Sequence, residues 1–198
     1  MPAYDFIPAW HETGACMDIR HIGWIYELLI RMKPTRTLEV GSHTGCSSSA
    51  FIAAGVPDAH FAEISPNDKF LSVVSGKGTV HQRKGAHVLM DEEPFDVVLL
   101  DGAHDLESVK EEWEAMQGKL PRVLILHDVF SASMGYPHCE GPAWLYEEIP
   151  TTWECFSDNA KREGEATHRG LAIFVRDGQA NSLLSANAVH AAFASQCW

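Results

Sequence analysis

The sequence predicts a single doubly wound α/β domain built on a mostly parallel, seven-stranded sheet. Strand-like and helical segments alternate over residues 22–149, which is the pattern of helices that cross over between parallel strands. The segment 95–100 is strongly apolar, as expected for a central strand that helices cover on both faces. Two further strand-like segments close the chain, and a terminal antiparallel strand is expected there.

Local signals place the elements in order along the chain. Ile22, Ile25, Leu29 and Met32 recur at helical spacing, and Pro34 ends the helix that they form. The expected elements are a helix at 22–32, strand 38–41, helix 46–54, strand 59–64, helix 65–75, strands 79–83 and 95–100, helix 106–116, strand 122–126, helix 142–149, and strands 153–156 and 170–176.

The later elements rest on similar signals. Ser65 is expected to be a helix N-cap, with Pro66 at the first helical position. The helix at 106–116 has one apolar stripe, and its acidic run of Glu111, Glu112 and Glu114 is expected to face solvent. A polar loop joins the last two strands.

Composition excludes several classes of partner. The 198 residues suffice for one domain, and the formal net charge of −12 argues against nucleic acid or an anionic membrane as a partner. The N-terminus lacks the pattern of a signal peptide, and the five cysteines have no paired spacing, so a cytoplasmic protein is expected. Residues 1–21 form an irregular N-terminal cap, and the tail at 178–198 is either loosely docked or a homodimer contact.

The first motif follows the first strand. Glu39 precedes a turn with the pattern E-x-G-x-x-x-G, which contains Gly41 and Gly45, and Glu63 ends the second strand about twenty residues later. Ser42 stands where a dinucleotide-binding loop has its second glycine, so this turn is less suited to a diphosphate. An acid before the turn suits an amine-bearing ligand, and Glu63 could accept ribose hydroxyls.

Two further motifs end neighbouring strands. Asp101 follows the central strand and precedes Gly102, Ala103 and His104, whereas His127 and Asp128 end the next strand. Because open α/β sheets bind ligands at the carboxyl ends of their strands, these side chains are expected to converge. Two carboxylates and an imidazole can together hold a divalent cation.

These motifs resemble those of the class I S-adenosylmethionine-dependent methyltransferases, which have a Rossmann-like fold. The pairing of DGAH with HDV is similar to the small-molecule O-methyltransferases of the catechol, macrolide-sugar and cephalosporin types. The resemblance implies O-methylation of a small hydroxylated molecule, and the acceptor pocket would be formed by residues 1–21 and the loop at 131–142. The implied cofactor-binding residues are Glu39, Gly41, Ser42, His43, Gly45, Glu63, Ala86, His87 and Asp101.

The resemblance also implies roles in catalysis and metal binding. His104 is the candidate general base, because a histidine with an ordinary pKa can be neutral and accept a proton, and Asp101 would orient it. Asp101, His127 and Asp128 match the family's metal ligands. His127 replaces an acid there, which favours Mn²⁺ or Fe²⁺ over Mg²⁺, or else a site that has lost its metal.

Two other functions fit parts of the pattern. A nicotinamide-dependent oxidoreductase would need the missing middle glycine. A non-catalytic module that binds S-adenosylmethionine and a protein partner is the stronger alternative, because a fold does not guarantee chemistry.

Overall fold

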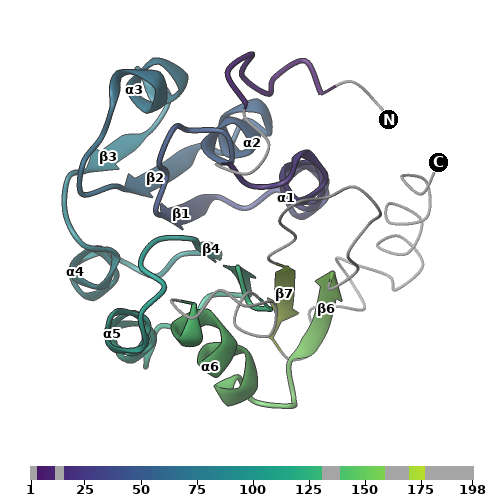
Figure 1. Cartoon of the computed structure of the whole chain (residues 1–198), viewed down its shortest axis with the longest axis vertical. Helices are drawn as coiled ribbons and strands as arrows, with labels where there is room; N and C mark the ends of the chain where they lie inside the picture. The colour runs from purple at the N-terminus through teal and green to yellow at the C-terminus, as the bar shows by residue number, and fades with distance from the viewer. Residues whose placement is uncertain (1–3, 12–15, 131–138, 159–169, 177–198) are drawn as a thin grey trace.

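A computed structural model describes residues 4–11, 16–130, 139–158 and 170–176 (Figure 1). Its centre is a seven-stranded sheet in the order β3-β2-β1-β4-β5-β7-β6. The strands are β1 (Arg36–Val40), β2 (Asp58–Ala62), β3 (Thr79–His81), β4 (Val97–Leu100), β5 (Val123–His127), β6 (Glu154–Asp158) and β7 (Leu171–Val175). The first five strands are parallel, and β7 lies between β5 and β6, antiparallel to both. The predicted fold class is confirmed.

Helices cover both faces of the sheet (Figure 1). They are α1 (Ile19–Met32), α2 (Ser48–Ala53), α3 (Asp68–Val74), α4 (Gly85–Asp91), α5 (Leu106–Met116) and α6 (Glu140–Glu148). The first three pack on one face and the last three on the other, so the interior consists of two apolar layers. Successive residues of β5 pack into opposite layers: Val123 and Ile125 face one layer, whereas Leu124 and Leu126 face the other.

Two local details differ from the sequence expectation. Helix α4 is additional, since its segment was expected to be a loop. Helix α3 is capped by Asn67, whose side chain accepts a hydrogen bond from the Phe70 amide at 3.1 Å, and not by Ser65. The Ser65 amide instead donates to Glu63 at 2.9 Å, which keeps this residue in the preceding turn.

Two expectations concern segments that lie partly or wholly outside the described residues. The tail at 178–198 lies outside them, as does most of the loop at 131–142. Helix α6 begins at Glu140, two residues before the expected start at 142. In the part of the chain that the structure describes, no helix has both the length and the apolar character needed to cross a bilayer.

Candidate functional site

A cavity of about 420 Å³ opens at the carboxyl edge of the parallel strands. It is bordered by the segments that follow β1, β2, β3, β4 and β5 and by the start of α1. Its lining includes the predicted residues Gly41, Ser42, His43, Glu63, Ala86, Asp101, His104, His127 and Asp128. The topology therefore brings together motifs that are up to about ninety residues apart in the sequence.

The loop after β1 lines the cavity, and two glycines determine its conformation. Gly41 has φ of +84°, and a Cβ atom there would lie 2.3 Å from the Asp101 backbone oxygen. Only glycine allows the ends of β1 and β4 to approach this closely. Gly45 also has a positive φ, +83°, and its backbone packs against Phe70 of α3.

Glu39 stabilises this loop through hydrogen bonds. It is fully buried and accepts hydrogen bonds from the hydroxyls of Ser42, Ser47 and Ser48. Burial raises its pKa to about 7, although the serine hydroxyls favour the charged form. Glu39 is not among the cavity-lining residues, and its contacts are with serines of the loop, of which Ser42 and Ser47 line the cavity. Its expected place near a ligand amine, directly or through water, stays a prediction.

Glu63 lies on the cavity wall and joins two loops. Its carboxylate accepts the backbone N–H of His43 and that of Ser65, each at 2.9 Å. One contact uses Oε2 and the other Oε1, and each oxygen retains a lone pair for a further donor. The position suits recognition of a diol, as the sequence predicts.

The wall formed by α4 and α5 contains an acid that the sequence analysis assigned to a solvated face. Glu112 is only 5% exposed, and its Oε2 atom has no hydrogen-bond partner among the described residues. Burial, with repulsion from Asp105, raises the pKa of Glu112 to about 8. A polar atom buried in this way at a cavity wall is suited to a ligand donor. Its neighbours Glu111 and Glu114 are exposed, as expected.

The predicted pair Ala86 and His87 divides between the cavity and the solvent. Both lie in the first turn of α4 and not in a loop. Ala86 is buried and lines the cavity, whereas His87 is exposed and does not. The expectation that His87 binds the cofactor is therefore corrected, because consecutive residues of a helix point in different directions.

Four titratable side chains meet at the ends of β4 and β5. His127 Nδ1 lies 2.9 Å from Asp101 Oδ1 and 3.3 Å from Asp128 Oδ1. His104 Nε2 lies 3.0 Å from Asp128 Oδ2 and 3.8 Å from Asp101 Oδ1. His127 belongs to β5 itself, one residue beyond the expected end of this strand.

The two acids favour protonated histidines in this cluster. Burial alone would lower the pKa of His104, but the carboxylates of Asp101 and Asp128 outweigh it and raise that pKa to about 10. The pKa of His127 is raised by the same two acids against the effect of burial. The sequence expectation of a neutral His104 is corrected for this arrangement, since a protonated imidazole donates and does not accept.

The cluster also fits a divalent cation. One ligand atom each from Asp101, His127 and Asp128 lies within 4.8 Å of the other two, and His104, Asp128 and Cys139 meet the same condition. Two carboxylates with one imidazole suit Mn²⁺, Fe²⁺ or Zn²⁺ better than Mg²⁺. From the sequence, metal ligation by Cys139 is only the less favoured alternative, and the structure places this residue next to His104 and Asp128.

His21 of α1 also lines the cavity and lies next to this cluster. The His21 ring lies 5.5 Å from that of His127, and His21 Nε2 is 3.3 Å from Asp158 Oδ2. Burial lowers the pKa of His21 to about 4, so His21 is neutral at neutral pH. The sequence analysis missed His21, because nothing in the helical pattern of α1 separates it from a core residue.

Comparisons with solved structures show that this fold is shared with O-methyltransferases. The O-methyltransferase TomG from Streptomyces achromogenes, solved with SAM, matches with a TM-score of 0.64 and 17% identity over 82% of each chain. An O-methyltransferase from Bacillus cereus in complex with SAH matches with a TM-score of 0.61 and 18% identity, over 86% of this chain and 84% of the other.

A third solved structure and two sequence comparisons complete these findings. The SAH-bound methyltransferase PaMTH1 from Podospora anserina matches with a TM-score of 0.61 and 15% identity, over 81% of this chain and 80% of that one. No protein-family model and no curated protein sequence matches this chain. The chain therefore has the Rossmann-like fold of these methyltransferases, with 15–18% sequence identity to them.

Proposed function

We propose that the protein is an S-adenosylmethionine-dependent O-methyltransferase that acts on a small hydroxylated molecule. The observation that carries this proposal is the cavity, which joins Glu63 on one wall to the Asp101–His104–Asp128 cluster on the other. A nucleoside bound beside Glu63 would therefore present its reactive end near the titratable cluster. The shared fold supports this assignment.

Each part of the cavity fits one part of this cofactor. Glu63 has lone pairs for the two ribose hydroxyls, and Gly41 and Ser42 bring backbone close to the methionine portion. Glu112 and Ala86 form the wall where the adenine would lie, and a protonated or charged Glu112 can pair with its ring edge. Met17 and Asp18 border the cavity at the start of α1. The bound cofactor supplies an electrophilic methyl group, so the protein need only align a nucleophile and accept its proton.

The acidic cluster is suited to the acceptor. A divalent cation held by Asp101, His127 and Asp128 would stabilise a developing oxyanion as a Lewis acid. His104 lies against both acids, so its capacity to accept a proton depends on how far their charge is compensated. The net charge of −12 supports a small molecule rather than nucleic acid as the acceptor, and a cytoplasmic location is part of this proposal.

Calorimetric titration with S-adenosylhomocysteine tests the cofactor site. We expect binding that Glu63→Gln weakens about 10- to 100-fold, because hydrogen bonds to a charged group contribute about 1.5–3 kcal/mol. Glu93→Gln, an exposed acid outside the cavity, is the matched control. Absence of binding to the unmodified protein, with and without added Mn²⁺, would refute the proposal.

Turnover distinguishes an enzyme from a non-catalytic binding module. With an acceptor found by screening hydroxylated compounds, we expect His104→Ala and Asp128→Asn to lower kcat at least about 100-fold. S-adenosylhomocysteine affinity should stay within a few-fold, because these residues lie at the acceptor end. Full turnover in both variants would remove the cluster from the chemistry.

A further inference from the structure

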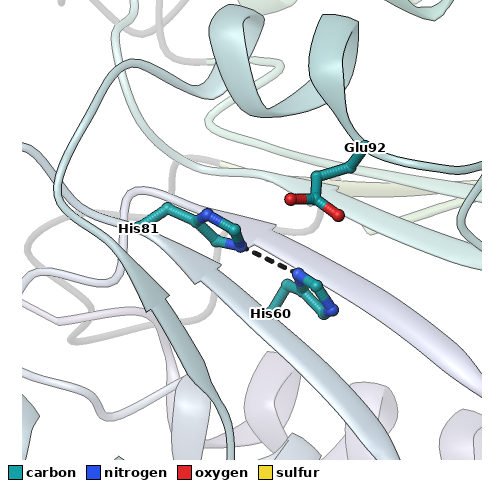
Figure 2. A group of neighbouring side chains, drawn as sticks. All are labelled: His60, His81 and Glu92. Atoms are coloured by element: carbon teal, nitrogen blue, oxygen red, sulfur yellow. Dashed lines mark hydrogen bonds between the residues drawn. The ribbon is translucent and has the colours of Figure 1, made fainter.

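A second group of metal-ligating side chains lies where β2 and β3 meet the end of α4. His60 projects from β2, His81 is the last residue of β3, and Glu92 follows α4 (Figure 2). One ligand atom from each lies within 4.8 Å of the other two. None of the three is among the residues that line the cavity, so this group is separate from the candidate active site.

The two histidines face each other through nitrogen atoms. His60 Nδ1 lies 2.8 Å from His81 Nε2, and the two rings are inclined by only 18° (Figure 2). When both rings are neutral, one proton lies between His60 Nδ1 and His81 Nε2. A cation that displaces this proton can bind the lone pairs of both nitrogens. Bonds of 2.0–2.1 Å in a tetrahedral site require the nitrogens to separate to about 3.3 Å. His81 is partly exposed at the edge of the sheet and can make this movement.

Asp58 orients His60 for this role. Asp58 Oδ1 lies 2.9 Å from His60 Nε2, and a carboxylate can only accept, so Nε2 carries the proton. Nδ1 then presents its lone pair to His81. Arg36 Nη2 approaches the same His60 Nε2 atom at the longer distance of 3.3 Å. A carboxylate on the distal nitrogen is the usual arrangement around a metal-binding histidine.

The charges of the group admit a cation. Arg36 contacts Asp58 Oδ2 at 2.8 Å and Glu92 Oε2 at 2.6 Å, and its guanidinium stacks on Phe95. These two carboxylates and one guanidinium carry a net charge of −1, and the Lys119 ammonium approaches the group only at the Glu92 backbone carbonyl, at 2.7 Å. Because Arg36 contacts Oε2, the second oxygen of Glu92 can serve as a ligand.

We propose that His60, His81 and Glu92 form a binding site for a divalent transition cation of the Zn²⁺ class. Two imidazoles and a carboxylate are ligands that such ions prefer, and a water molecule would complete four-fold coordination. His81 and Glu92 flank the segment 82–91, whose residues Arg83 and Ala86 line the cavity. A bound cation would therefore tie both ends of this segment to the sheet. The proposal does not depend on methyl transfer.

Cobalt titration of the chelator-treated full-length protein tests this site, with bound metal measured by equilibrium dialysis and visible absorption. We expect His81→Gln to remove one equivalent of bound Co²⁺ and Glu92→Gln to weaken that equivalent at least about tenfold. Asp58→Asn should weaken it about 10- to 100-fold, because His60 loses its orienting partner. His81 and Glu92 are partly exposed, so these variants should fold, which circular dichroism checks.

His87→Gln and Glu93→Gln are matched controls on neighbouring exposed positions, and both should bind like the unmodified protein. Cations held by the Asp101 cluster remain in every variant and cancel in the comparison. Equal stoichiometry and affinity in His81→Gln and the unmodified protein would overturn the proposal. So would absence of any Co²⁺ binding at sub-millimolar concentration.

Discussion

Glu112 shows how burial changes the role of a single residue. Its helix α5 presents exposed acids on both sides of it, yet Glu112 itself is buried against the cavity. Gly85 makes this possible, because a Cβ atom there would lie 2.9 Å from Glu112 Oε1. The same Cβ atom would lie still closer to Val40 Cγ1, at 2.4 Å, so a larger residue at this position would displace Val40 as well as the Glu112 side chain.

The raised pKa of Glu112 predicts a pH-dependent stability. The folded protein holds this proton up to pH of about 8, whereas an ordinary glutamate loses it near pH 4.5. The folded state thus binds more protons than the unfolded state between these values, and stability falls as the pH rises. The slope is about 1.4 kcal/mol per pH unit from this group.

Urea unfolding at pH 5, 7 and 9 measures this effect through Glu112→Gln. The glutamine is neutral throughout, so the variant should lose less stability between pH 5 and pH 9 than the unmodified protein. Glu39 has a raised pKa in both proteins and cancels in the comparison. Glu114→Gln on the exposed face should leave the profile unchanged. Parallel profiles for Glu112→Gln and the unmodified protein would contradict the assignment.

Among the elements, the turn from β1 to α2 is constrained by a close approach of two backbones. Gly41 has φ of +84° and its backbone contacts the ends of β4, whereas Gly118 has φ of +85° with open space around it. The two glycines therefore have nearly the same φ in very different surroundings.

Alanine at each glycine separates backbone strain from the close approach of the strands. We expect Gly118→Ala to cost about 1–2 kcal/mol of unfolding free energy from backbone strain. Gly41→Ala should cost at least about 2 kcal/mol more, because β1 and β4 must move apart, and S-adenosylhomocysteine binding should weaken. Thermal or urea unfolding gives the difference, and equal losses in the two variants would show that the approach is not tight.

Elements with strong local signals were predictable, whereas helix α4 was not. Residues 22–32 and 106–116 have clear apolar stripes, and both correspond to helices α1 and α5 within a few residues. Helix α4 has seven residues and no side-chain cap, so little in its sequence indicates a helix. Its stability comes from packing against α5 and the sheet, which a local pattern does not contain.

Over the whole molecule, a buried ion pair links the first helix to the end of β6. Arg20 Nη2 lies 3.1 Å from Asp158 Oδ2, and the two residues are only 4% and 8% exposed. His21 contacts the same carboxylate, and its ring in turn lies against His127. This network connects α1 and β6 with His127, which lines the cavity.

Removing the acid of this pair should destabilise the protein strongly. Asp158→Asn removes the shorter of two carboxylate contacts of the buried Arg20, which keeps Asp18 at 3.4 Å, and we expect a loss of about 1.5–3 kcal/mol. Asp91→Asn is the matched control, because Asp91 pairs with Arg83 at 2.5 Å on an exposed surface, where such pairs contribute under about 1 kcal/mol. Urea unfolding compares the two, and losses of similar size would refute a structural role for the buried pair.

The sequence by itself determined the fold class, the positions of the main strands, and the convergence of Glu63, Asp101, His127 and Asp128 at one edge of the sheet. These follow from local apolar patterns and from the rule that parallel strands end on the same side. Only the tertiary structure decided that Glu39 is buried under its loop, that Glu112 lines the cavity and that His104 lies between two carboxylates. The physical reason is that burial and charge pairing depend on neighbours distant in sequence, and these neighbours set both the orientation and the protonation of each group.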